Sequence, residues 1–135
     1  MAPLSKLTGL DQRAAARFAG AGAGSVEAFL GAAASLASRR ELARLTGLDE
    51  ERVLGWARQA DLMRVKGVGG QYAELLAAVG VASAAELARS HAPAVREAMV
   101  KANGSRPAPL RALPSIETVR RWVAAAARLP TGLEE

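Results

Sequence analysis

The sequence predicts an all-α fold built from one duplicated unit, and three observations lead to this interpretation. Apolar side chains recur at helical spacing, as in the segment 72–79, where they stand at positions i, i+3, i+4 and i+7. No stretch alternates apolar and polar residues between turn residues, as a half-buried strand would. Segments of the first half of the chain also recur in the second half, which indicates internal repetition.

The repetition follows a nearly constant shift. Glycines, apolar positions and tryptophans keep their order at a shift of 58 residues, which later becomes 66. The Pro-rich stretch 105–114 accounts for the extra residues of the second copy. We therefore predict a single domain over residues 1–135, with internal repeats at approximately 4–60 and 62–129 packed as a pseudo-symmetric pair. The corresponding positions are Leu7–Leu10 with Val65–Val68, Gly22 with Gly80, Ser25 with Ser83, and Trp56 with Trp122.

Capping residues mark the ends of the predicted helices. Ser25, Ser83 and Ser115 are suited to the N-cap, where a hydroxyl accepts from the first helical turn. The segments Leu7–Asp11 and Leu45–Asp49 both read Leu-Thr-Gly-Leu-Asp, in which glycine ends one helix and aspartate caps the next. The predicted helices span residues 11–20, 25–31, 38–46, 49–60, 62–66, 70–79, 83–90, 93–103 and 115–128.

Composition excludes several classes of function. The 135 residues include no cysteine and one histidine, His91, so neither a thiolate site nor a His-rich zinc site is expected. The N-terminal residues lack a basic region followed by an apolar stretch, and no run is long enough to span a bilayer. We expect a cytoplasmic protein with no cofactor, no metal and no membrane partner.

The positive charge is concentrated toward the C-terminus. The chain carries 18 basic and 13 acidic residues, a net charge of +5. Between Arg96 and Arg128 stand seven basic and two acidic residues, so this segment alone accounts for the excess. A localised positive charge favours a polyanion or an acidic protein as partner.

The segment Leu62–Val81 holds a glycine turn between two apolar helical patterns. Its core is Arg64-Val65-Lys66-Gly67-Val68-Gly69-Gly70. Two glycines allow a sharp change of direction, and Val68 can insert into the core. The N–H groups that begin the next helix would then face outward, where a phosphate can accept them, and Lys66 would add charge.

This segment resembles the helix-hairpin-helix motif of DNA repair and recombination proteins. The resemblance implies that the turn residues bind the DNA backbone, which here means Lys66, Gly67, Val68 and Gly69, with Arg64 and Gly70 beside them. Contacts of this kind do not read base sequence. The motif often has basic residues after its second glycine, where this chain has Gly70 and Gln71. In the first copy Asp11 replaces the second glycine and would repel phosphate, so we expect that hairpin to be structural.

The whole chain is similar to a family of bacterial and archaeal proteins catalogued as a domain of unknown function. Its members share a duplicated helix-hairpin-helix plan, and the resemblance implies the fold without implying an activity. The residues that carry it are Arg39–Ala43, Thr46-Gly47, Val53-Leu54-x-Trp56, Ala60–Gly69, Tyr72-Ala73-x-Leu75-Leu76, Glu86–Ala88, Met99-Val100-x-Ala102-Asn103, Leu113–Ser115 and Val119-x-x-Trp122.

Other polar groups are interpreted as structural or auxiliary. Arg120 and Arg121 lie on one face of the last predicted helix, which is either a phosphate-binding face or an ordinary solvated one. Trp56 and Trp122 could stack on bases, but their equivalent places in two repeats favour core packing. The acidic cluster Asp49–Glu51 reads best as the first turn of a helix. No nucleophile has an obvious base, so we expect no enzyme.

The sequence therefore predicts a non-enzymatic binding module. The first hypothesis is binding to the backbone of duplex DNA, without sequence specificity, by the turn Lys66–Gly70 aided by four arginines. The alternative is a protein–protein interaction adaptor with no nucleic-acid role, in which an apolar groove and the arginines meet an acidic partner. The four arginines are Arg106, Arg111, Arg120 and Arg121.

Overall fold

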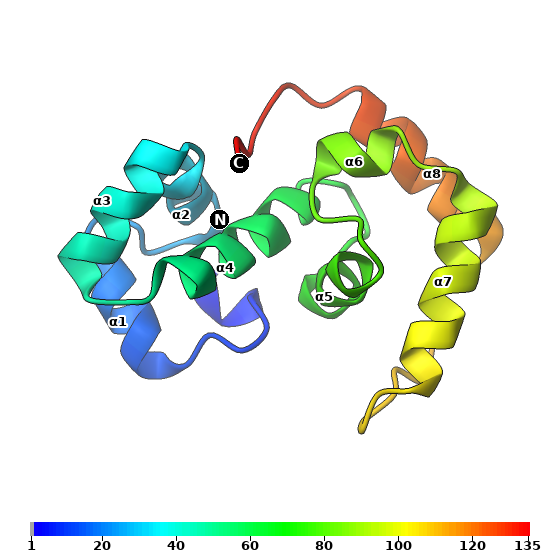
Figure 1. The fold of residues 1–135 in the computed structure, drawn as a ribbon, viewed down its shortest axis with the longest axis horizontal. Helices are drawn as coiled ribbons and strands as arrows, with labels where there is room; N and C mark the ends of the chain where they lie inside the picture. The colour runs from blue at the N-terminus through cyan, green and yellow to red at the C-terminus, as the bar shows by residue number, and fades with distance from the viewer. Residues whose placement is uncertain (1) are drawn as a thin grey trace. The chain divides into compact units, whose positions relative to one another are not determined.

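The computed structural model describes residues 2–135, and this part of the chain is all-helical, as predicted (Figure 1). Its sole extended pairing is an isolated bridge between Pro3 and Ser25. A short 3-10 helix, η1, precedes the α-helices and was not predicted. The elements are η1 (Leu4–Lys6), α1 (Gln12–Gly20), α2 (Val26–Ala33), α3 (Leu36–Thr46), α4 (Glu50–Leu62), α5 (Gly70–Ala78), α6 (Ala84–Ala88), α7 (Ala92–Gly104) and α8 (Ile116–Ala127).

Residue contacts divide the chain into two compact units. Unit 1 runs to Asp61 and also includes Thr131–Glu135, and unit 2 comprises Leu62–Pro130. The chain thus leaves unit 1 after α4 and returns to it for its last five residues. The boundary falls where the two predicted repeats meet. The origin of both units in one duplication stays a prediction.

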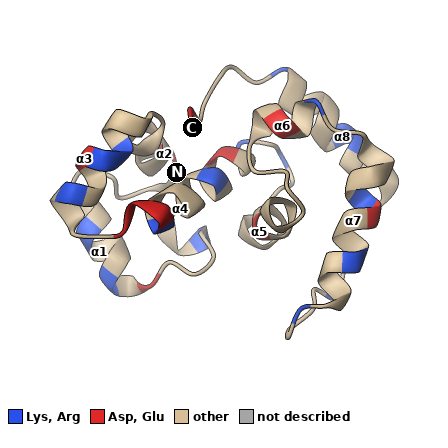
Figure 2. Cartoon of the chain, in the orientation of Figure 1, with Lys and Arg blue, Asp and Glu red and all other residues tan. Residues whose placement is uncertain are grey.

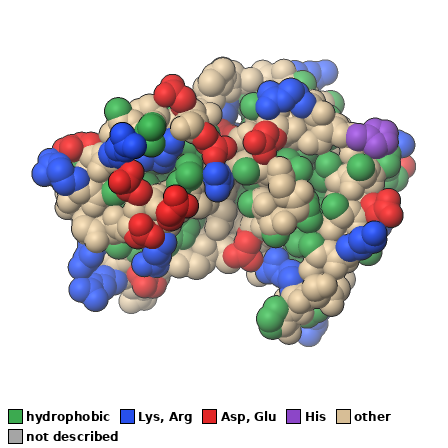
Figure 3. Space-filling model, viewed as in Figure 1, with side chains coloured by type: hydrophobic (Ala, Val, Ile, Leu, Met, Phe, Trp, Pro, Cys, Tyr) green, Lys and Arg blue, Asp and Glu red, His purple; other side chains and the backbone are tan. Residues whose placement is uncertain are grey.

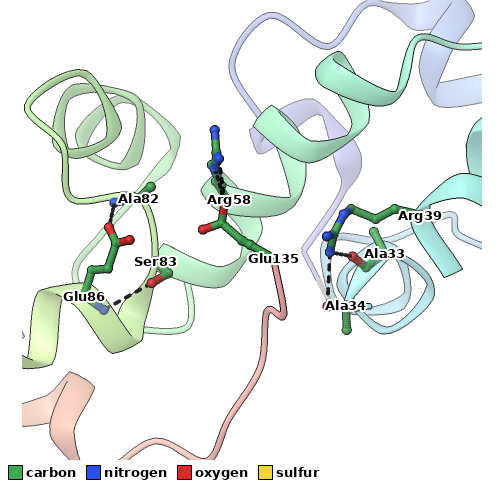
Figure 4. Close-up of polar contacts among 8 residues, drawn as sticks. All are labelled: Ala33, Ala34, Arg39, Arg58, Ala82, Ser83, Glu86 and Glu135. Atoms are coloured by element: carbon green, nitrogen blue, oxygen red, sulfur yellow. Dashed lines mark hydrogen bonds and ion pairs between the residues drawn. The ribbon is translucent and has the colours of Figure 1, made fainter. Parts of the chain in front are cut away.

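Side-chain caps begin the helices at the predicted serines. The Oγ atoms of Ser25, Ser83 and Ser115 each accept a backbone N–H three residues further on, at 3.1, 3.1 and 3.2 Å. Beside Ser83, Glu86 makes two contacts: its N–H donates to the serine hydroxyl, and its carboxylate accepts the N–H of Ala82 at 2.7 Å (Figure 4). These contacts satisfy N–H groups that have no partner within the helix.

Unit 1 is built around a cluster of aromatic rings. Phe18 of α1 lies 4.8 Å from Phe29 of α2 and 5.7 Å from Trp56 of α4, measured between ring centroids. All three side chains are buried. The Arg52 guanidinium lies over the Trp56 ring, 4.8 Å from its centroid. The prediction that Trp56 is a core residue is confirmed.

Unit 2 has an aliphatic core around its own tryptophan. Trp122 of α8 is 2 % exposed, which confirms that it too packs in a core. Residues from the end of α4, from the turn and from α5 to α8 form one core cluster with it. The largest of them are Leu62, Val65, Leu75, Leu76, Leu87, Met99 and Val119, all below 2 % exposure.

The predicted helix over residues 62–66 is wrong. Helix α4 continues to Leu62, and residues 63–67 form a turn. The N–H of Val65 bonds to the carbonyl of Leu62, and the N–H of Val68 to that of Val65, both at 3.0 Å. The apolar spacing of this segment is that of a helix, but its i to i−3 bonds and the left-handed Gly67, at φ +94°, turn the chain instead.

The aromatic cluster of unit 1 supports a first prediction. Phe18→Ala should lower the free energy of unfolding by about 3–5 kcal/mol, because a fully buried ring is lost and a cavity remains. Urea denaturation followed by circular dichroism measures this. The control is Leu45→Ala. Leu45 is 58 % exposed, so this substitution should change the free energy of unfolding by less than about 0.5 kcal/mol. Equal effects of the two substitutions would contradict this account of the core.

Candidate nucleic-acid interface

The glycine turn of unit 2, Lys66–Gly70, packs on the core of that unit and on Trp122. Val65 and Val68 are buried at 1 % and 5 % exposure, while Lys66, Gly67 and Gly69 are exposed. The turn is therefore fixed through its two valines, and its glycines and its lysine lie at the surface. A methyl group added at Gly67 would come within 3.1 Å of Trp122 Nε1. Both the left-handed backbone and this close approach require glycine.

Helix α5 begins without a side-chain cap. Its N-cap is Gly69, and no acidic residue stands in its first turn. Among residues 2–135, no acceptor is hydrogen-bonded to the N–H groups of Gly70, Gln71 or Tyr72. Such a helix start offers donors and a positive dipole end to an anion.

The turn of unit 1 has a similar backbone conformation, but its N–H groups are bound by different side chains. Gly9 is left-handed at φ +80°, as Gly67 is at +94°. The Asp11 carboxylate caps α1 by accepting the N–H of Ala14 at 2.8 Å, as the sequence predicted. Seven backbone N–H donors of residues 4–29 make hydrogen bonds that recur at a shift of 58. These donors are Leu7, Leu10, Ala15, Ala21, Gly22, Ala23 and Phe29 in unit 1, and Val65, Val68, Ala73, Val79, Gly80, Val81 and Leu87 in unit 2.

Gln59 also closes the turn of unit 1, and sequence reasoning did not single it out. Its Oε1 accepts the N–H of Thr8 at 2.8 Å and its Nε2 donates to the carbonyl of Thr8 at 3.2 Å. In unit 2 Lys66 stands in the place of Thr8. The shift of 66 that relates the two tryptophans puts Ala125 in the place of Gln59. Alanine cannot make these bonds, and the N–H of Lys66 has no acceptor within the described chain.

A loop specific to unit 2 presents Arg111 beside the start of α5. The buried Asn103 side chain donates to the carbonyl of Leu110 at 3.0 Å and accepts its N–H at 2.8 Å. On the other side, Tyr72 Oη donates to the carbonyl of Ala112 at 3.0 Å. Arg111 lies between these two anchored residues and is exposed. Tyr72 is the third residue of α5, so the loop lies next to the uncapped helix start.

The remaining predicted arginines are placed differently. Arg106 forms an ion pair with Glu74 at 2.8 Å, which neutralises part of its charge. Arg64 donates to the carbonyl of Pro130. Arg121 donates to Thr118 Oγ1 at 3.2 Å within α8. Arg120 is exposed on α8. The structure therefore anchors Arg111 near the turn and engages Arg64, Arg106 and Arg121 with groups of unit 2 itself.

The positive charge of the chain resides in unit 2. This unit has ten basic and four acidic side chains, a net charge of +6. Unit 1 has eight basic and nine acidic side chains, a net charge of −1. Figure 2 shows basic residues along α7 and α8 and the acidic first turn of α4. The open turn thus belongs to the unit that attracts anions.

Within residues 2–135 no three His, Asp or Glu side chains converge as metal ligands would. His91, purple in Figure 3, is exposed at the start of α7. No helix in this range combines the length and apolarity needed to cross a membrane.

Comparison with known proteins identifies a family for the chain. Residues 8–129 match the family described as "Domain of unknown function (DUF4332)". The match covers most of the chain, which therefore belongs to this family. No curated protein and no solved structure matches significantly.

The contact between Gly67 and Trp122 leads to a second prediction. Gly67→Ala should destabilise the protein by about 1–2 kcal/mol, because alanine is strained at positive φ and its methyl crowds the indole. Thermal unfolding measures this. The matched control is Gly55→Ala in α4, where a methyl meets no neighbouring atom within 4 Å. That substitution should stabilise by up to about 1 kcal/mol, since alanine favours helix. Effects of the same sign at both positions would contradict the interpretation of Gly67.

Proposed function

We propose that this chain is a non-enzymatic module that binds the backbone of duplex DNA, without sequence specificity, through the turn Lys66–Gly70. The observation that carries the proposal is the contrast between the two turns. In unit 1, Gln59 and Asp11 engage the N–H groups of Thr8 and Ala14. The equivalent N–H groups of Lys66 and Tyr72 in unit 2 have no acceptor among residues 2–135. A phosphate oxygen can supply one.

The proposal includes a helix-hairpin-helix origin for both turns. The residues between α4 and α5 form the turn of the second hairpin and carry the resemblance. The recurring hydrogen bonds of these seven donors support a duplication, since unrelated segments would not share bond after bond at one shift. In this interpretation the first copy retains the shape of the hairpin, while Asp11 and Gln59 fill its phosphate site.

Charge would add affinity to the contacts of the turn. Lys66 and Arg111 are exposed at or near the start of α5, and Arg120 is exposed on α8. Each basic group that neutralises a phosphate releases counterions, so binding should weaken steeply with salt. The side chain of Arg106 would contribute less, because Glu74 already pairs with it. Without contacts to base edges such an interface does not discriminate sequence.

A protein-interaction adaptor is the second candidate. The observation that favours it is an open hollow of about 640 Å³ in unit 1, lined by Arg17, Gly20, Ala21, Leu45 and Thr46. Leu45 is 58 % exposed there, and exposed apolar side chains beside an arginine suit a protein partner. Failure of duplex binding at low salt would move the assignment to this candidate.

The third prediction tests the charge at the turn. A fluorescent duplex titrated across a salt series should bind the wild-type chain and lose affinity as salt rises. Lys66→Glu should weaken binding at least about tenfold at low salt, because it removes a phosphate contact and adds repulsion. Lys6→Glu is the control, since it makes the same charge change in unit 1. If both variants bind equally, net charge rather than the turn determines affinity, and the proposal is wrong.

The fourth prediction transfers the closing carboxylate from unit 1 to unit 2. Gly69→Asp places an aspartate at the N-cap of α5, where φ is −90° and an added side chain meets no atom within 4 Å. The fold should be unchanged or slightly more stable, because the carboxylate caps the helix. Duplex affinity should fall at least about tenfold, because the same carboxylate repels phosphate.

The matched control for Gly69→Asp is Gly69→Asn. Asparagine can cap the helix without adding charge, so its loss of duplex affinity should be much smaller. Thermal unfolding of both variants checks that the fold is kept. Retention of wild-type affinity by the folded Gly69→Asp chain would rule out phosphate binding at this helix start.

A further inference from the structure

The last residues of the chain are bound to unit 1 by three polar contacts. The Glu135 carboxylate pairs with Arg58 of α4 at 2.5 Å (Figure 4). The N–H of Leu133 donates to Asp61 Oδ1 at 3.3 Å, and the N–H of Glu134 donates to the carbonyl of Ala34 at 2.6 Å. Residues 133–135 are therefore held as an extended segment, by two successive backbone donors and one acidic side chain.

The groups that receive this segment belong to the helices of unit 1. Asp61 lies in α4 and is 2 % exposed with the segment in place, and Ala34 stands at the end of α2. The buried Arg39 donates to the carbonyls of Ala33 and Ala34, at 2.9 and 3.2 Å, and so orients the acceptor at that helix end (Figure 4). A buried carboxylate and a fixed carbonyl both prefer N–H donors to an apolar cover. Arg58 adds a cation at the point where the third residue lies.

We propose that the end of α2 and the second half of α4 form a binding site for an extended acidic peptide of a partner protein. Residues 131–135 occupy this site as a tethered ligand that such a peptide displaces. The partner peptide must offer the groups that residues 133–135 offer now. These are two successive backbone N–H groups in an extended segment, followed by an acidic side chain. The half-buried Leu133 at the first of these positions makes an apolar residue the best match there. The site lies in unit 1 and is independent of the proposed DNA contact.

The contacts suit exchange of one ligand for another. The side chains of Arg58 and Glu135 are each 35 % exposed, so their ion pair is screened and weak. A tethered segment competes at an effective concentration of about millimolar, which a partner segment of higher affinity overcomes. Displacement leaves Asp61, Ala34 and Arg58 with equivalent partners on the incoming peptide, so no buried acceptor loses its donor.

The experiment uses an amidated peptide with the sequence of residues 129–135, titrated onto the isotope-labelled full chain and followed by NMR. Glu135→Ala weakens the chain's own segment and provides the receptor. The peptide should shift the backbone resonances of residues 34, 58 and 61, with a dissociation constant of about millimolar. The wild-type chain should bind it about two- to tenfold more weakly, because its intact segment competes.

Matched variants and peptides test whether binding depends on Arg58 and on the acidic residues of the peptide. Adding Arg58→Ala to the Glu135→Ala chain should weaken binding about two- to fivefold, whereas adding Arg13→Ala should not change it. A peptide with glutamine in place of both glutamates should bind as weakly as the Arg58→Ala chain does. Absence of shifts in α2 and α4 at about 10 mM peptide, ten times the expected constant, overturns the proposal. Equal peptide affinity of the Glu135→Ala and wild-type chains also overturns it. So does equal affinity of the Arg58→Ala and Arg13→Ala variants of the Glu135→Ala chain. In each case the remaining resonances must show that the fold is intact.

Discussion

The close approach of Trp122 to the backbone of Gly67 is the contact on which the rest of unit 2 depends. With 3.1 Å between the indole and the place of a β-carbon, the turn must be glycine, and its positive φ sends Val68 into the core. That in turn fixes where α5 begins. Tyr72, three residues after Gly69, packs on the same indole with ring centroids 5.4 Å apart and holds the loop that carries Arg111. One aromatic side chain thereby positions the turn, the helix start and the tyrosine that holds the loop of Arg111.

The two turns differ in few side chains, yet in one turn those side chains bind the backbone N–H groups and in the other the N–H groups are left available. A folded chain must give its backbone N–H groups acceptors, and exposed groups can find them in solvent or in a ligand. Unit 1 uses Gln59 and Asp11 for this purpose. Unit 2 has Ala125 and Gly69 at the corresponding places, so the same backbone shape keeps its donors available. The difference lies in side chains that do not change the path of the backbone, which is why seven backbone donors can make the same hydrogen bonds in both units.

The sequence predicted the parts of the structure that depend on local patterns. The all-α fold, the serine caps and the burial of both tryptophans follow from spacing and from residue type. The prediction of a helix over 62–66 was wrong because two buried valines three positions apart fit a helix and this turn equally well. The contacts of Gln59 and Asn103 were not predicted, because each binds a backbone carbonyl and N–H, which nearly every residue offers. The contact of Arg58 with Glu135 joins residues 77 apart and leaves no local pattern.

The two proposed sites select opposite partners because they present opposite hydrogen-bonding groups. The turn of unit 2 presents N–H donors and cations in a unit of net charge +6, a combination suited to an anion with many oxygens. The site on unit 1 presents two acceptors, Asp61 and the Ala34 carbonyl, with Arg58 as the cation that pairs with the ligand's acid. A phosphate backbone has no donor for those acceptors, so it would lose their contacts and meet the Asp61 carboxylate. An extended peptide supplies two N–H groups and one acid, which matches the site on unit 1 and leaves the turn of unit 2 free for a different ligand.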